Sequence, residues 1–100
     1  MYEATIILPF GEFDGYQAEF ETELIDAFGG FTRDECKGGW RAPNGETILE
    51  PVSRYTVAGY DLPTNNGNLA TLAFSYGQKL NQQAVYIRYF DGQVEILDTH

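Results

Sequence analysis

The sequence predicts an α+β fold in which an antiparallel sheet carries two helices on one face. The length of 100 residues suits a single domain, residues 1–100, and is too short for two independent cores. Hydrophobic residues make up 43% of the chain, which is enough to build such a core. The apolar spacing alternates between the periods of strand and helix in the order β-α-β-β-α-β, followed by a short extra strand.

The first part of the chain predicts a strand and a helix. The run Ala4–Phe10 is apolar and rich in β-branched residues, as in a central strand covered on both faces. Asp14 followed by Gln17 is typical of a capped helix start, and Gly29-Gly30 is typical of a helix end. Between them one apolar stripe has spacings of three and four: Tyr16, Phe20, Leu24, Ala27 and Phe28.

The middle of the chain predicts a long β-hairpin. Phe31–Arg41 alternates as a strand does, and Gly38-Gly39 within it indicates a bulge or bend. Pro43-Asn44-Gly45 marks the turn. In the return strand Thr47–Ala58, Pro51 indicates an edge position or a bulge.

The last part predicts a loop, a second helix and two strands. The loop covers Asp61–Gly67, and Asn66 or Asn68 is expected to cap the helix that follows. The helix stripe consists of Leu69, Leu72, Ala73, Tyr76 and Leu80. Ala84–Phe90 and Gln93–Leu97 are strands joined by a two-residue turn at Asp91-Gly92. The complete order is that of a ferredoxin-like fold with a short extra C-terminal strand.

A signature in the middle of the chain resembles a family of small bacterial and phage-associated proteins. The matching segments are Gly29-Gly30-Phe31-Thr32, Gly38-Gly39-Trp40-Arg41, Gly45 and Glu50-Pro51-Val52-Ser53-Arg54. The resemblance extends over residues 28–90. It implies the ferredoxin-like fold and implies no particular activity.

The charge of the chain is strongly negative and unevenly distributed. The formal net charge is −9, and residues 12–35 carry one base, Arg33. The acids of that segment are Glu12, Asp14, Glu19, Glu21, Glu23, Asp26, Asp34 and Glu35. Such a balance disfavours nucleic acid and anionic membranes as partners, and favours a basic protein surface or a cation.

Aromatic residues on the predicted strands are candidates for lining an open sheet face: Tyr55, Tyr86, Tyr89 and Phe90. RNA-binding proteins of this fold stack bases on such residues, but they have basic surfaces. The single cysteine fits a reducing compartment, and the chain start lacks the pattern of a secretory signal. We therefore expect a cytoplasmic protein, in the host cytoplasm if a phage encodes it.

Catalytic and cofactor signatures are weak in this sequence. The one histidine, His100, is the last residue, so Cys36 has no imidazole partner in the sequence pattern. The glycine pairs do not stand between a strand and a helix start, as a phosphate loop requires. The expectation is a protein that is not an enzyme and holds neither a metal nor another cofactor.

The leading functional prediction is a non-enzymatic interaction protein. An acidic face would occlude a basic surface of another protein, as in a phage-type inhibitor of a host or defence nucleic-acid-binding machine, for example an anti-CRISPR-like protein. The predicted contact residues are Glu12, Glu19, Glu23, Asp26 and Asp34.

An alternative prediction places the function on the open face of the sheet. That face would form a ligand pocket or a homodimer interface with Trp40, Arg41, Arg54, Tyr55 and Arg88. A purely structural interpretation also stands, in which Trp40 packs over the sheet and the two hairpin arginines pair with Glu46 or Glu50.

Overall fold

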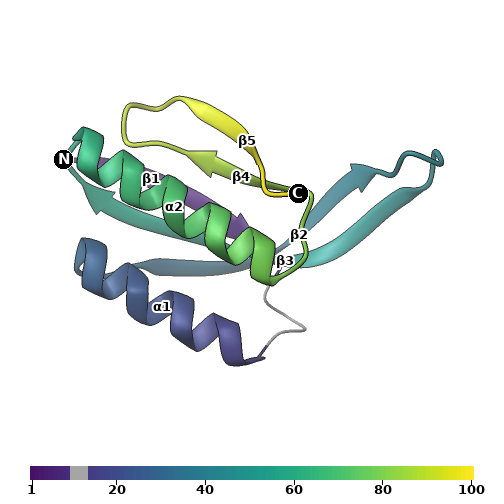
Figure 1. Cartoon of the computed structure of the whole chain (residues 1–100), viewed down its shortest axis with the longest axis horizontal. Coiled ribbons are helices and arrows are strands. Elements are labelled where there is room, and N and C mark those ends of the chain that lie inside the picture. Colours follow the sequence, from purple (N-terminus) through teal and green to yellow (C-terminus); the bar gives the residue numbers. More distant parts are fainter. Residues whose placement is uncertain (10–13) are drawn as a thin grey trace.

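The computed structural model describes residues 1–9 and 14–100, so Phe10 and Glu12 lie outside the described residues. The elements are β1 (Tyr2–Leu8), α1 (Asp14–Phe28), β2 (Thr32–Arg41), β3 (Thr47–Gly59), α2 (Pro63–Lys79), β4 (Ala84–Arg88) and β5 (Val94–Asp98). The five strands form one antiparallel sheet in the order β2-β3-β1-β4-β5. This order confirms the ferredoxin-like prediction, with β5 as the extra edge strand (Figure 1).

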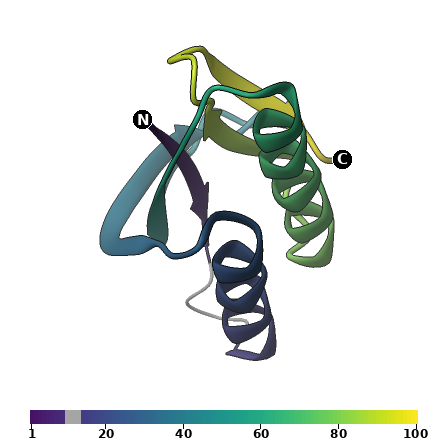
Figure 2. The same ribbon diagram turned by 90° about the vertical axis from the view of Figure 1, so that its left-hand side faces the viewer.

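Both helices lie on the same side of the sheet and leave its other face open (Figure 2). Side chains of a strand alternate between the two faces, so the helix side of β1 carries Ala4, Ile6 and Leu8, which are all buried. Phe20 and Leu24 of α1 and Tyr76 of α2 close the same core. The open face therefore carries the intervening residues, and these are mainly polar.

The hairpin of β2 and β3 extends beyond the rest of the sheet as a two-stranded arm (Figure 1). Its register runs unbroken from Thr32 opposite Thr56 to Arg41 opposite Thr47, so of the predicted bulge or bend at Gly38-Gly39 the bulge is absent from this ladder. These glycines instead leave room for side chains of β3. A Cβ on Gly39 would lie 3.0 Å from Leu49 Cδ2, and one on Gly38 would lie 3.3 Å from Val52 Cγ1.

Pro51 lies within this arm and does not interrupt β3. Pairing of β3 with β1 begins at Ser53, so no strand of the described residues flanks Pro51 on the side away from β2. This position agrees with the predicted edge position of Pro51.

The second helix begins earlier in the chain than the predicted caps Asn66 and Asn68. It starts at Pro63, and Leu62 is the N-cap residue without a side-chain cap. The fixed φ of proline suits the first helical position, where an N–H has no helical partner. No helix among the described residues is long and apolar enough to cross a membrane.

Candidate functional site

The acidic face of α1 makes contacts within the molecule. Glu19 Oε1 lies 2.9 Å from Lys79 Nζ of α2, and this hydrogen bond is the first cause of the lowered pKa of Glu19. Glu23 accepts a hydrogen bond from the hydroxyl of Tyr76. These carboxylates hold α1 against α2, and a docking partner would have to compete with those contacts.

The remaining predicted contact acids make different contacts or none that the structure describes. Asp26 is exposed on α1, and Glu12 lies outside the described residues. Asp34 belongs to β2 and pairs with Arg54 of β3, with 3.2 Å between Arg54 Nη2 and Asp34 Oδ2. That pair lies on the open side of the sheet, so Asp34 and the acids of α1 occupy different surfaces.

Tyr55 lies on the helix side of β3, contrary to its predicted place on the open face. Its side chain is 1% exposed, and its hydroxyl donates to Glu21 Oε2 at 2.7 Å. Gln17 Nε2 donates to the same hydroxyl at 3.2 Å. Burial, followed by the hydrogen bond to Glu21, raises the pKa of Tyr55 to about 12.

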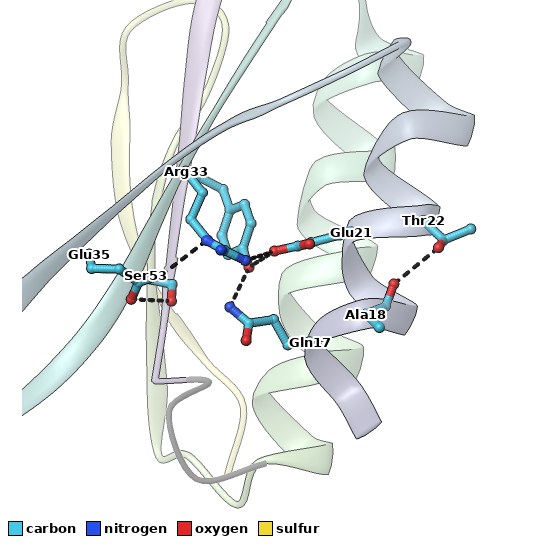
Figure 3. A network of polar contacts seen from close by, with 8 residues as sticks. Gln17, Ala18, Glu21, Thr22, Arg33, Glu35 and Ser53 are labelled. Atoms are coloured by element: carbon cyan, nitrogen blue, oxygen red, sulfur yellow. Dashed lines mark hydrogen bonds and ion pairs between the residues drawn. The ribbon is translucent and has the colours of Figure 1, made fainter. Parts of the chain in front are cut away.

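Charged groups of β2 complete this network on the helix side. Figure 3 shows Arg33 of β2 and Glu21 of α1 pointing toward one another, and the two form an ion pair. Arg33 Nε also lies 3.0 Å from Glu35 Oε1, and Ser53 Oγ donates to Glu35 Oε2 at 3.0 Å. The network fastens α1 to the hairpin and leaves the open face free of these groups.

Two neighbouring rows of side chains cross the open face of the sheet. The register places Asp34, Arg54, Ile7, Tyr86 and Ile96 in one row across all the strands. The next row contains Thr32, Thr56, Thr5, Arg88 and Val94. Polar and charged groups thus occupy the centre of this face, where no helix covers them.

A charged hollow of about 340 Å³ lies over these rows. Its charged side chains are Glu3, Asp34, Arg54 and Arg88, and its floor includes Thr5 and Thr56. Arg54 is paired with Asp34, whereas Arg88 belongs to no ion pair within residues 1–9 and 14–100. The hollow therefore offers both a carboxylate and an available guanidinium to a ligand.

A larger hollow of about 580 Å³ lies beside it, toward the arm. Trp40 and Glu50 reach it from the arm, Asn81 and Gln83 from the turn between α2 and β4, and Ile96 from β5. Tyr86 lines both hollows. Aromatic and apolar walls with a few amide groups are typical of sites for flat heteroaromatic ligands. We refer to the two as the charged hollow and the aromatic hollow.

The structure separates the residues predicted for the open face. Trp40 lines the aromatic hollow, and Arg54 and Arg88 line the charged hollow. Arg41 lies outside both, and its Nη1 donates to the carbonyl oxygen of Gly45 in the turn of the arm at 2.9 Å. Neither hairpin arginine pairs with Glu46 or Glu50 in the described part of the chain.

Of the four aromatics predicted for the open face, Tyr86 lines both hollows. Phe90 is buried in the core, and the hydroxyl of Tyr89 donates to Glu95 at 2.5 Å. The sequence interpretation missed Glu3, Asn81 and Gln83. Strand alternation could have placed Glu3 on the open face, but the two amides come from a turn that only the folded chain brings beside Trp40.

Comparison with known proteins gives matches among solved structures. No protein-family model and no curated protein matches the chain. A phage SAM lyase in complex with S-methyl-5'-thioadenosine superposes with a TM-score of 0.76, at 10% identity, over 97% of this chain and 88% of the lyase chain. A phage SAM lyase in the apo state superposes with a TM-score of 0.66, at 13% identity, over 94% of this chain and 83% of that one.

These matches identify the fold. The chain shares the fold of the two phage SAM lyases over nearly its whole length. This finding overturns two predictions, that of a non-enzymatic interaction protein and that of a chain with no enzyme activity. The contacts of Glu19 and Glu23 within the molecule give a physical reason, because the acidity of α1 is largely used to hold the helices together.

Proposed function

We propose that this protein is an enzyme that binds S-adenosylmethionine on the open face of its sheet and cleaves it to S-methyl-5'-thioadenosine. The observation that carries the proposal is the superposition with the phage SAM lyase, which holds that thioadenosine. The two adjoining hollows on the open face support the proposal, because their chemistry differs in the way the two parts of the substrate differ.

The aromatic hollow suits the adenosine. The indole of Trp40 is 46% exposed and offers an aromatic surface on which an adenine ring can stack. Asn81 and Gln83 carry both donor and acceptor atoms for the ring nitrogens. The carboxylate of Glu50 is an acceptor for ribose hydroxyls.

The charged hollow suits the sulfonium end of the substrate, with Tyr86 between the two parts. Forming the thioadenosine breaks the bond between the sulfonium sulfur and the Cγ of the amino-acid group, and the bonding electrons return to sulfur. The amino-acid group leaves as a lactone if its own carboxylate attacks Cγ, or as an unsaturated amino acid if a base removes a β proton. Both routes conserve the atoms of the substrate, and nuclear magnetic resonance of the products distinguishes them.

The net charge also fits this substrate. S-adenosylmethionine carries a net positive charge, and a chain of formal charge −9 attracts a cation. S-methyl-5'-thioadenosine is uncharged, so this attraction is lost once the sulfonium has reacted. The acidity that first indicated a basic protein partner is thus also suited to a small cationic substrate.

The direct test is to incubate the purified protein with S-adenosylmethionine and to follow S-methyl-5'-thioadenosine by chromatography and mass spectrometry. The expected result is product that accumulates in proportion to protein and time, above the spontaneous decay of the substrate. A folded wild-type protein that forms no product above that background would overturn the proposal.

A variant of the aromatic hollow tests the placement of the adenosine. Trp40→Ala should lower kcat/KM by about tenfold or more, because base stacking on an aromatic ring is typically worth about 1–3 kcal/mol. Leu49→Ala is the matched control, because Leu49 is exposed on the arm and lies outside both hollows. Equal rates for the two variants would show that the adenosine does not bind at Trp40.

A further inference from the structure

The charged hollow brings two bases and two acids together on the open face. Arg54 and Arg88 are two of six Lys and Arg residues, and both lie in this hollow together with Glu3 and Asp34. A site with both signs of charge side by side complements a zwitterion better than it complements a simple anion or cation.

We propose that the charged hollow is a binding site for an α-amino acid group, in which Arg88 binds the α-carboxylate and Glu3 binds the α-ammonium. The inference rests on the proposed function, since the amino acid is the one attached to the adenosyl sulfonium. It adds the residues that let the protein select ligands with an intact amino-acid group.

The geometry distinguishes Arg88 from Arg54. The guanidinium of Arg54 is held by Asp34 at 3.2 Å, so its charge is already compensated within the protein. Arg88 forms no ion pair with any described acid and keeps its fork of N–H donors for a carboxylate.

The position of Glu3 relative to Arg88 fits the two ends of one amino acid. Thr5 stands opposite Arg88 in the register, and Glu3 lies on the same face of β1 two positions before Thr5. Glu3 and Arg88 are therefore diagonal neighbours across Thr5, at a Cα separation of about 7–8 Å. The ammonium and carboxylate of one ligand fit between side chains at that spacing, over the hydroxyls of Thr5 and Thr56.

The consequence is a measurable preference among adenosyl ligands. S-adenosyl-L-homocysteine contains the amino-acid group but no sulfonium, whereas S-methyl-5'-thioadenosine contains neither. Wild-type protein should bind the first about tenfold or more tightly than the second, because hydrogen bonds between charged groups in a hollow add to affinity.

The experiment is calorimetric titration of both ligands into wild type, Arg88→Met, Arg88→Lys and Arg41→Met. We expect Arg88→Met to weaken the binding of S-adenosyl-L-homocysteine by about tenfold and to leave the affinity for the thioadenosine unchanged. Arg88→Lys should recover part of the loss, because it keeps the charge but not the planar fork. Arg41→Met is the control, since Arg41 lies outside the hollow and bonds to the turn of the arm.

Two results would overturn the inference: unchanged binding of S-adenosyl-L-homocysteine by Arg88→Met, or an equal loss of both ligands. Either result is compatible with a wild-type protein that still forms S-methyl-5'-thioadenosine, in which case the proposed function survives. If the wild-type protein binds neither ligand and forms no product, the proposed function itself is wrong.

Discussion

At the scale of single residues, strand alternation decides on which face of the sheet a side chain lies, and so which contacts it makes. Arg54 and Tyr55 are adjacent in β3, yet one lines the charged hollow and the other is buried against α1. Neighbouring positions in a strand point to opposite faces, so they cannot belong to one site on a sheet. The sequence interpretation placed both residues in one surface, and the structure shows that this was wrong for Tyr55.

The buried hydroxyl of Tyr55 predicts a stability effect that depends on pH. Tyr55→Phe should reduce the free energy of unfolding at neutral pH by about 0.5–3 kcal/mol, because Glu21 loses a buried donor. The hydroxyl ionises at its ordinary pKa of 10.0 in the unfolded chain and at about 12 in the folded protein. Its contribution is therefore complete below pH 10 and declines as the pH rises to 12.

Urea unfolding of wild type and Tyr55→Phe at a series of alkaline pH values measures this effect. The difference in the free energy of unfolding between the two proteins should shrink as the pH rises from 10 to 12. A difference that stays constant throughout would contradict the assigned hydrogen bond. Comparing the two proteins at each pH removes the contributions of the other tyrosines.

At the scale of elements, the sequence patterns identified every helix and strand but not all of their ends. Pro63 starts α2 inside the predicted loop, and a continuous β3 passes through Pro51. In both cases the cost of a proline depends on whether its N–H would have had a partner, and the surrounding structure decides that.

Two glycines of α2 provide a matched pair of variants. A Cβ on Gly77 would lie 2.6 Å from Thr99 Cγ2 and 2.8 Å from Val85 Cγ2, so the helix approaches β4 and the chain end closely there. A Cβ on Gly67 would meet nothing within 4 Å. The two positions share a helix but differ in their surroundings.

Gly77→Ala should destabilise the protein by about 1–3 kcal/mol through overpacking. Gly67→Ala should stabilise it by about 0.4–1 kcal/mol, because alanine reduces the freedom of the unfolded chain. Thermal unfolding of both variants checks the prediction. Similar shifts of the melting temperature in the same direction for both variants would show that α2 packs more loosely at Gly77 than the structure indicates.

At the scale of the whole molecule, the net charge and the open face act together. The acidic side chains Glu19, Glu21 and Glu23 are engaged by Lys79, Arg33 and the two core tyrosines on the helix side. The field of a chain at −9 nevertheless extends into solvent around both faces. If the proposed function holds, this field concentrates the cationic substrate near the protein, and the hollows of the open face supply the specific contacts.

This arrangement predicts a salt effect on the reaction. Added potassium chloride should lower kcat/KM for S-adenosylmethionine by about severalfold between low and high salt, because ions screen long-range attraction. The affinity for uncharged S-methyl-5'-thioadenosine should hardly change over the same range. Initial rates and calorimetric titrations at several salt concentrations measure the two quantities. Rates that rise with salt would contradict an attraction by the negative field.

The sequence by itself determined the order of elements, the ferredoxin-like topology and the strong negative charge. Periodicity and turn residues act locally, so these features can be read without knowing the fold. Two residues of the charged hollow, Arg54 and Arg88, could also be predicted from their positions in the strands.

Only the tertiary structure decided which side chains meet. Strand register brings Asp34, Arg54, Tyr86 and Ile96 into one row from segments far apart in the chain. It also sends the acids of α1 to partners on α2 and β2, where they hold the helices in place. Those contacts depend on long-range pairing that no local pattern encodes, and so the proposed site lies on the face opposite to the one that carries α1.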